Sequence, residues 1–413
     1  MFEEECVVKI GEFAKVNKTT IDTIRHYMDM SILNPDKNGT YYDFDDHAQK
    51  DYETIIALKQ LGFSISEIQT LMLFERIGKY TGYNQRKTYK AFYKNKLQWI
   101  DDELNRLKTM QEKLEDAIDA MPENNEEDSR VAGAPLDALS MLFCKKCQQA
   151  YRLIDGHVDQ GEVLNGIMTC SCGERLVIHE GIVYGEGALN SSEAFVFDDT
   201  FIEDYVQTTH IDYLKNLHLT LQWARNYSIF KNADKGSILE LGSGRGFFLR
   251  NMIEMIPKQS VYIAVDHNPN AHQWLKKDLA NAGKNLKILY LCCDFNEIPL
   301  QEHSIDYLID ATGSTNYAFD HSDFLMDSIV TLLKQTCLYQ GHFLLFENFS
   351  LNTLIPKDRR KWFQKEGVQD ELSKLGFKCM RHYETQLISK GGPGEDFFVD
   401  GEKIYNYLYI GKL

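Results

Sequence analysis

The stretch Ser237-Ile-Leu-Glu-Leu-Gly-Ser-Gly-Arg-Gly-Phe-Phe248 decides the fold of the C-terminal part of the chain. An apolar run that is typical of a buried strand passes directly into glycines at three alternate positions, and an apolar helix start follows. Glycines let a backbone approach a ligand closely, and the first turn of a helix presents unpaired N–H groups. The pattern therefore predicts a ligand-binding turn between a strand and a helix. Dinucleotide sites share it, so the loop alone leaves the ligand open.

Four further apolar runs follow the glycine loop, and three of them end at an aspartate. Helical segments separate the runs, and this alternation predicts a parallel α/β sheet. Asp266, Asp294 and Asp310 would stand at carboxyl ends of strands, the edge at which such sheets bind ligands. A carboxylate about 20 residues after a glycine loop can accept both hydroxyls of a ribose. The four runs are residues 261–265, 286–293, 304–309 and 342–347.

Together, Glu240-x-Gly-x-Gly-x-Gly and the three aspartates resemble the class I S-adenosylmethionine-dependent methyltransferases over about residues 200–413. The resemblance implies a Rossmann-like, seven-stranded sheet closed by strands around 397–399 and 404–410. It implies that the glycines approach the methionine and ribose of S-adenosylmethionine, that Asp266 holds the ribose and that Asp294 binds the adenine amine with Phe295 stacked beside it. Asp310 would form the edge of the methyl-donor pocket. The implied cofactor-binding residues are Glu240, Gly242, Gly244, Gly246, Asp266, Asp294, Phe295 and Asp310.

The residues that would carry out methyl transfer are less marked in the sequence. Transfer from a sulfonium needs in-line positioning and, for some acceptors, a base. Asp310 is the first candidate for a catalytic residue, with His321 and Glu347 as alternatives. Residues 310–317 lack the Asn/Asp-Pro-Pro-aromatic signature, which disfavours methylation of the adenine amino group. A dehydrogenase is the rival interpretation of the glycine loop, but no residue here suggests a hydride-transfer partner.

Four of the nine cysteines form two close pairs within 29 residues: Cys144-Lys-Lys-Cys147 and Cys170-Ser-Cys172. Two thiolate pairs on turns supply four soft ligands for tetrahedral zinc, with no open coordination position, so we predict a structural zinc site. The surrounding residues resemble the short zinc ribbons found beside several methyltransferases. A redox pair is the alternative. We expect His157 and His179 not to be ligands. The other cysteines are expected to pack in cores: Cys6, Cys292, Cys293, Cys337 and Cys379.

The N-terminal residues 8–28 show two short apolar stripes around a polar break at 17–20, the pattern of a helix-turn-helix with Thr20 as a helix cap. A turn at Asn38-Gly39, flanked by aromatic residues, predicts a β-wing. With the later Leu61-Gly-Phe-Ser-Ile-Ser-Glu-Ile68, this ordered set resembles the DNA-binding domain of the MerR family of transcriptional regulators over about residues 7–120. The resemblance implies that six residues face DNA: Lys18, Thr20, Thr23, Arg25, Tyr41 and Tyr42.

The wing departs from the family at Tyr42-Asp43, where an arginine often accompanies the aromatic residue. A missing positive charge weakens binding to DNA and flattens its dependence on salt. A helical module that binds protein instead of DNA is the alternative interpretation.

A long helix is predicted from Arg86 to Met121. Its apolar residues follow alternating spacings of three and four, which is a coiled-coil seam with Gln111 as the single polar member. The MerR resemblance implies an antiparallel homodimer through this helix. An amphipathic helix packed on its own chain is the alternative. The seam is Leu97, Ile100, Leu104, Leu107, Gln111, Leu114, Ile118 and Met121.

Length and composition agree with several soluble domains. The chain has 413 residues, a formal charge of −16, no apolar run long enough for a membrane span and an acidic start unlike a signal peptide, so we expect a cytoplasmic protein. The expected function is regulation at operator DNA combined with methylation of a small molecule. A non-catalytic sensor and an RNA-directed methyltransferase are the alternatives, and the acidic charge disfavours the latter. The expected parts are 1–84 (winged helix-turn-helix), 85–121 (coiled coil), 122–135 (linker), 136–185 (zinc ribbon) and 186–413 (methyltransferase).

Overall fold

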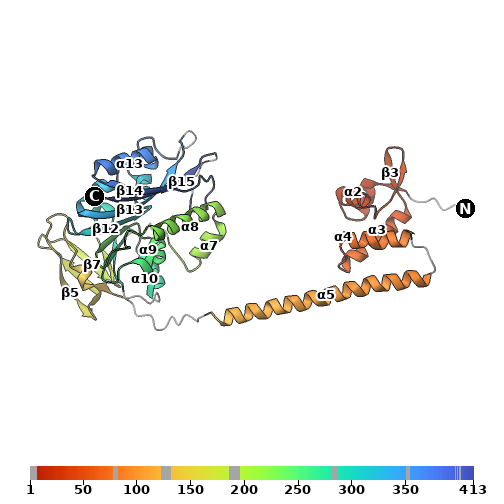
Figure 1. The fold of residues 1–413 in the computed structure, drawn as a ribbon, viewed down its shortest axis with the longest axis horizontal. Coiled ribbons are helices and arrows are strands. Elements are labelled where there is room, and N and C mark those ends of the chain that lie inside the picture. Colours follow the sequence, from red (N-terminus) through yellow and green to blue (C-terminus); the bar gives the residue numbers. More distant parts are fainter. Residues whose placement is uncertain are drawn as a thin grey trace. The chain divides into compact units, whose positions relative to one another are not determined.

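The chain forms two compact units, residues 1–124 and 125–413, each of which is described by itself. The structure is a computed structural model, and Figure 1 shows its elements coloured along the sequence. In α5 the side chains are described from residue 87 onward. The described residues are 7–77, 82–121, 132–185, 196–280, 286–349, 354–395, 397, 399 and 401–413.

The first unit contains the predicted helix-turn-helix and wing. Thr20 caps the second helix as expected, because its Oγ1 accepts a hydrogen bond of 3.1 Å from the backbone N–H of Thr23. The apolar stripes on both helices meet in one core with Phe44 of the wing and Ile55 of the third helix. The elements are β1 (Val8–Lys9), α1 (Ile10–Val16), α2 (Ile21–Asp29), β2 (Asp36–Asn38), β3 (Tyr41–Phe44), α3 (Asp46–Gln60) and α4 (Ile65–Ile77).

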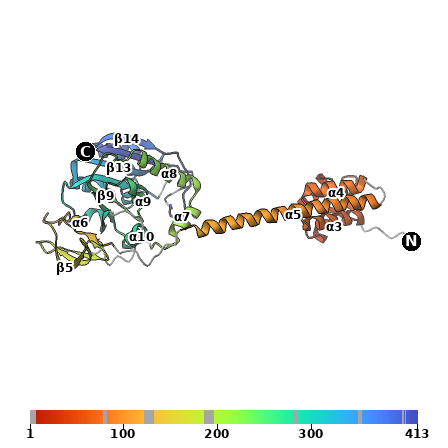
Figure 2. The same ribbon diagram turned by 60° about the horizontal axis from the view of Figure 1, so that its bottom comes forward.

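The long helix α5 (Gly82–Asp119) ends this unit. Its first turns pack on the helix-turn-helix core through Tyr89 and Phe92, and Figure 2 shows α3 and α4 beside that end of α5. Further along, the predicted seam is exposed: 60% of Leu97 and 63% of Leu114 face solvent in the single chain. Among the described residues, no helix is both long and apolar enough to span a bilayer.

The second unit is built on one large sheet. Its central strands are parallel and run in the order β11-β10-β9-β12-β13. At one edge β15 pairs antiparallel with β13, and β14 pairs antiparallel with β15. This confirms the predicted Rossmann-like, seven-stranded methyltransferase sheet. Its strands are β9 (Ser237–Leu241), β10 (Val261–Asp266), β11 (Lys287–Cys292), β12 (Ile305–Ala311), β13 (Leu333–Phe346), β14 (Lys378–Glu384) and β15 (Ile404–Lys412). Its helices of at least six residues are α7 (Phe201–Thr208), α8 (Ile211–Asn226), α9 (Phe247–Met252), α10 (Pro269–Ala280), α11 (Gly313–Asp320) and α13 (Lys365–Lys374).

The cysteine-bearing segment extends this same sheet. The strand β8 pairs in parallel with β11, and β7, β6 and β4 follow in order, with β5 on β6. In Figure 1 these strands, near the labels β5 and β7, continue the sheet at the end away from β14. The segment contains β4 (Ala134–Pro135), α6 (Leu136–Leu139), β5 (Arg152–Asp159), β6 (Glu162–Thr169), β7 (Arg175–His179) and β8 (Ile182–Tyr184).

One face of the central sheet is covered by residues from this segment. The 293–304 connection between β11 and β12 contains only the short 3-10 turn η4 (Phe295–Glu297), although parallel strands are usually joined by a helix that covers the sheet. In place of such a helix, Leu139 and Leu142 pack into the cluster that holds Val265 and Leu289. The cysteine-bearing segment therefore completes the hydrophobic core of the second unit.

Several expectations need correction. The outer antiparallel partner of β15 is β14, and Phe397 lies outside the strands, where its ring packs against Phe319. The strand expected at 342–347 begins at Leu333. Ala134 and Pro135, expected in the linker, pair with β6, whereas residues 122–131 lie outside the described part.

The scattered cysteines were expected to pack in cores, and this holds for three of them. Cys292, Cys293 and Cys337 are buried, whereas Cys379 is exposed on the edge strand β14. An edge strand has only one neighbour, so its side chains can remain open to solvent. Cys6 lies outside the described residues.

Candidate functional site

The glycine loop turns at the carboxyl end of β9 and is held against β10. The backbone N–H groups of Gly242 and Ser243 both donate to the carbonyl of Val265, over 2.9 and 3.0 Å. Gly242, Gly244 and Gly246 have φ values of +69°, +48° and +74°, a left-handed conformation that is unfavourable for residues with a Cβ. This backbone requirement explains the three glycines that the sequence analysis singled out.

Asp266 lies next to the loop, as expected for a residue at the end of β10. Its Oδ2 accepts a hydrogen bond of 2.8 Å from the backbone N–H of Gly244, and its Oδ1 accepts one of 2.9 Å from Asn268. The side chain is largely buried. A carboxylate has about four acceptor positions, so Asp266 can accept further hydrogen bonds from a ligand.

Phe295 approaches the other side of the loop. A Cβ on Gly242 would lie 3.6 Å from Cζ of the Phe295 ring and 3.3 Å from the Cα of Gly313. The loop, the turn after β11 and the start of α11 are thus brought together as predicted. Asp294 caps η4 by accepting a hydrogen bond of 2.7 Å from the N–H of Asn296, and it is exposed.

Glu240 and Asp310 are buried within the protein. The Tyr262 hydroxyl donates to Glu240 over 2.8 Å, and burial raises the pKa of Glu240 to about 8. Asp310 accepts hydrogen bonds from the N–H of Ser314 and the hydroxyl of Tyr339, and burial raises its pKa as well. Both carboxyl groups therefore support the strand ends from within, and their contact with a cofactor remains a prediction.

The alternative bases also have protein partners. His321 donates from Nδ1 to the carbonyl of Tyr317 over 3.0 Å, and the two rings stack at 3.8 Å. This places His321 at the end of α11 as a helix-terminating residue. Glu347 is exposed and lies 3.9 Å from the ammonium of Lys403. Neither contact points to a role in proton transfer.

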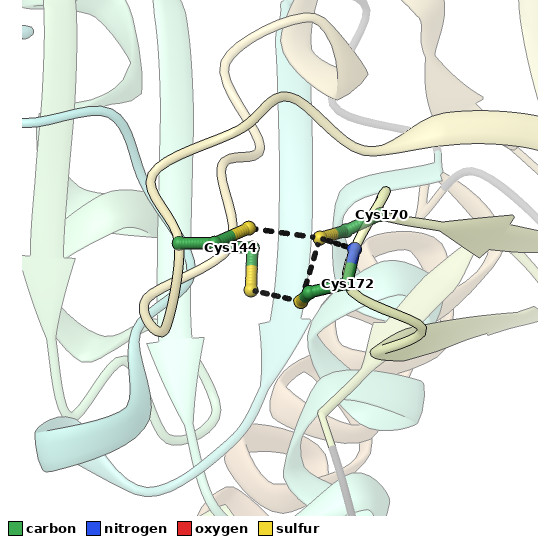
Figure 3. A group of neighbouring side chains, drawn as sticks. Cys144, Cys170 and Cys172 are labelled. Atoms are coloured by element: carbon green, nitrogen blue, oxygen red, sulfur yellow. Dashed lines mark hydrogen bonds between the residues drawn. The ribbon is translucent and has the colours of Figure 1, made fainter.

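The four predicted metal ligands are brought together. Their Sγ atoms all lie within 4.8 Å of one another, and Figure 3 shows Cys144, Cys170 and Cys172 pointing toward a common centre. The Sγ–Sγ distances are 3.6 Å for Cys144–Cys172, 3.2 Å for Cys147–Cys170 and 3.0 Å for Cys170–Cys172. Tetrahedral zinc with Zn–S bonds of about 2.3 Å requires sulfur separations of about 3.8 Å, so the cluster is close to the size of a zinc site.

The crowding of the four thiols means that metal binding is linked to the release of protons. Desolvation, together with the hydrogen-bonded thiol of Cys172, raises the pKa of Cys170 to about 12. Zinc binds thiolates, so its binding would displace protons from this crowded group. His157 and His179 are exposed and lie outside the cluster, as expected.

The predicted DNA-facing residues lie on the surface of the first unit. Lys18, Thr20 and Arg25 are exposed, and Arg25 is 3.5 Å from Asp22 of its own helix. Thr23 is half-buried, and its hydroxyl lies 2.8 Å from that of Thr20. On the wing, Tyr41 is 66% exposed and Tyr42 is 38% exposed.

Two lysines beside the wing tyrosines were not among the predicted DNA-facing residues: Lys37 of β2 and Lys9 of β1. The ammonium of Lys37 lies 6.0 Å from the centre of the Tyr42 ring, and that of Lys9 lies 5.5 Å from the Tyr41 ring. The hairpin register pairs Lys37 directly with Tyr42 across the strands. Counting back from the Asn38-Gly39 turn would have found this pair. Lys37 therefore places a positive charge beside Tyr42 although the wing lacks the expected arginine, whereas the charge of Lys9 is paired with the carboxylate of Asp43.

Comparisons with known protein families agree with both units. Residues 8–75 match the family described as MerR HTH family regulatory protein, and residues 238–336 match a methyltransferase domain family. The chain carries a MerR-type regulatory domain and a methyltransferase domain. The second match begins in β9 and includes the glycine loop, Asp266, Asp294 and Asp310. No curated protein sequence shows a significant match to this chain.

Solved structures that resemble the methyltransferase domain include one protein from Methanosarcina mazei and one from Aquifex aeolicus. An S-adenosylmethionine-dependent methyltransferase from Methanosarcina mazei is 13% identical, with 45% of this chain and 97% of that chain covered and a TM-score of 0.35. One from Aquifex aeolicus is 15% identical, with 52% and 98% covered and a TM-score of 0.32.

Proposed function

We propose that this protein is a DNA-binding transcriptional regulator whose methyltransferase domain binds S-adenosylmethionine and methylates a small molecule. The observation that carries the proposal is the contact between Gly244 and Asp266, which brings an acidic strand end to a glycine loop. This arrangement suits a ligand that combines a ribose with a group needing close backbone approach. Ser243 supports it, because its buried hydroxyl has no hydrogen-bond partner among the described residues.

The residues around the loop would divide the cofactor between them. Asp266 would accept the ribose hydroxyls, Asp294 the adenine amine, and Phe295 would stack on the adenine ring. The backbone of the glycine loop would lie against the methionine portion. S-adenosylmethionine supplies a methyl group activated by its sulfonium, so the protein mainly needs to hold the acceptor in line with it.

The regulatory part of the proposal rests on the first unit. The solvent-facing side of helix α2 would enter the major groove, and the wing would contact phosphates through Tyr41, Tyr42 and Lys37. Two chains would pair through the exposed seam of α5, which explains why large apolar side chains on this helix face solvent. A paired protein would contact two half-sites on the operator.

A sensor that binds the cofactor without methylating anything is the second candidate. The burial of Asp310 favours it, because both of its carboxylate oxygens already have protein partners and the residue cannot readily take a proton from a substrate. Reactions that need no base remain compatible with this burial.

The experiment is a calorimetric titration of the full chain with S-adenosylmethionine. We expect wild type to bind, and Asp266→Ala to bind on the order of a hundredfold more weakly, because losing hydrogen bonds to a carboxylate costs about 1.5–3 kcal/mol. Asp234→Ala, which changes an exposed aspartate before β9, is the control and should leave the affinity unchanged. A wild-type protein that binds neither the cofactor nor its demethylated product at millimolar concentration contradicts the proposal.

Transfer of a labelled methyl group distinguishes a small-molecule methyltransferase from the two alternatives. Host extract incubated with methyl-labelled cofactor should yield a labelled small molecule with wild type and none with Asp266→Ala. Label recovered in RNA would instead support the RNA-directed alternative. If no label is transferred and the cofactor changes the affinity for operator DNA, the domain is a sensor.

A further inference from the structure

Residues 141–143, which lead to the predicted metal ligand Cys144, are joined to residues 299–301. The latter follow residues 294–297, which we call the adenine-binding turn because Asp294 and Phe295 are the proposed adenine contacts. The N–H of Phe143 donates to the carbonyl of Pro299 over 2.9 Å, and the N–H of Gln301 donates to the carbonyl of Met141 over 3.1 Å. Between them, Leu142 and Leu300 form an antiparallel β-bridge. Three residues of one segment are therefore held in register with three of the other.

Both ends of this junction carry functional residues. On one side the next residue is Cys144, the first predicted metal ligand. On the other side the chain before Pro299 contains η4, with Phe295 and Asp294 at its start. A direct charge contact joins the two ends, because the ammonium of Lys145 lies 3.6 Å from the Glu297 carboxylate.

The junction is packed into the core. Leu142 and Leu300 are almost completely buried, and they belong to the same cluster as Leu289 and Leu291 of β11. A shift of residues 141–143 would open apolar surface to water, so this segment and residues 299–301 have to move together. The metal ligands fix one end of the segment, since Cys144 and Cys147 are held to Cys170 and Cys172 of the β6–β7 turn.

We propose that the four-cysteine site positions the adenine-binding turn, so that zinc and S-adenosylmethionine strengthen each other's binding. The inference rests on the proposed function, because it requires that Asp294 and Phe295 hold the cofactor. Coupling of two sites is reciprocal: the factor by which zinc raises the affinity for the cofactor equals the factor by which the cofactor raises the affinity for zinc. Both directions are therefore measurable on one protein.

The first test uses full-length, zinc-loaded protein and the same protein after removal of zinc with a chelator, with circular dichroism to monitor folding. We expect removal of zinc to weaken S-adenosylmethionine binding in calorimetry by about fivefold or more. In the reverse direction, saturating cofactor should slow the release of zinc to the chelator. An unchanged affinity in folded, zinc-free protein overturns the coupling alone. Absence of cofactor binding to zinc-loaded protein overturns the proposed function with it.

The second test leaves the cysteines intact, so it tests the coupling between the two sites even if the zinc-free protein unfolds. Lys145 and Lys146 are neighbours on the same turn, but Lys146 pairs with Glu174 within the ribbon, at 2.7 Å. Lys145→Glu would place two carboxylates beside each other at the junction, and we expect about two- to fivefold weaker cofactor binding with one zinc still bound per chain. Lys146→Glu is the matched control and should bind the cofactor as wild type does. Equal affinities for the two variants contradict the proposal.

Discussion

Gly244 donates its backbone N–H to the carboxylate of Asp266 over 2.8 Å, and this hydrogen bond closes the glycine loop onto the next strand. A hydrogen bond to a carboxylate is stronger than one between neutral groups, so the loop is held in place before any ligand binds. Preorganisation of this kind reduces the entropy lost on binding. The same contact also means that a change at either residue affects both the loop and its ligand.

The glycines of the loop should respond differently to alanine. A Cβ on Gly246 would lie 2.3 Å from Leu275 Cδ1 of α10, so we expect Gly246→Ala to lower the free energy of unfolding by about 2 kcal/mol or more. A Cβ on Gly244 meets nothing within 4 Å among the described residues. Gly244→Ala should therefore lower the free energy of unfolding by only about 1 kcal/mol. We expect the same substitution to reduce the free energy of cofactor binding by at least as much. Urea unfolding and calorimetry measure the two effects, and equal stabilities of the two variants would contradict the assigned packing.

Lys37 of the wing should contribute to DNA binding through its positive charge. We expect Lys37→Ala to weaken binding to operator and random DNA alike, and to reduce the slope of log affinity against log salt by about one. Lys50→Ala, which removes an exposed lysine of α3 outside the wing, serves as the comparison. Fluorescence anisotropy at several salt concentrations measures both slopes. An unchanged slope for the wing variant shows that Lys37 does not contact phosphate.

The seam of α5 should hold two chains together. Leu107 is 49% exposed in the single chain, and a charge there would be buried in a paired helix. We expect Leu107→Glu to give monomers in sedimentation equilibrium at concentrations where wild type is dimeric, and to weaken operator binding. Thr109→Glu adds the same charge at an exposed position off the seam, and it should remain dimeric. A monomeric wild type would favour the alternative in which α5 packs on its own chain.

Glu240 should make stability depend on pH. Burial raises its pKa from 4.5 to about 8, so the folded protein keeps a proton that the unfolded chain releases above pH 4.5. The stabilising contribution is complete below pH 4.5 and is lost as the pH rises to about 8. We expect wild type to lose stability relative to Glu240→Gln across this range, by at most about 1.4 kcal/mol per pH unit. Urea unfolding at several pH values measures this difference, with Glu302→Gln, at an exposed position, as control; parallel curves for wild type and Glu240→Gln would refute the shift.

Local patterns in the sequence predicted most of the fold. Thr20 is a helix cap because its side chain and the next turn are adjacent in sequence, and the glycine loop is recognisable because strand, turn and helix follow directly. The strand β14 was missed because its side chains are exposed on both faces, which removes the alternation that marks a strand. The strand at 397–399 is implied by the methyltransferase resemblance alone; in the structure Phe397 lies outside the strands and its ring packs against Phe319.

Contacts between distant segments were beyond what the sequence could predict. The four cysteines could be grouped because two short spacings suggest two metal-binding turns. Their attachment to the methyltransferase sheet depends on the pairing of Tyr184 with Cys292, for which there is no local pattern. Likewise, the sequence marked Asp310 as a site residue from its position after a strand, but its burial depends on Tyr339 from the neighbouring strand.

The bridge between Leu142 and Leu300 has a consequence for synthesis on the ribosome. Leu142 emerges before β11 and Leu300 have been made, so its side chain lacks these long-range partners until residue 300 has emerged. The cysteines at 144–172, by contrast, are all present early and can gather around zinc locally. The metal would then hold residues 144–172 together on the nascent chain. The core of the second unit would close only after residue 300 has emerged. Translation that pauses before that point leaves an apolar surface open to chaperones or to aggregation.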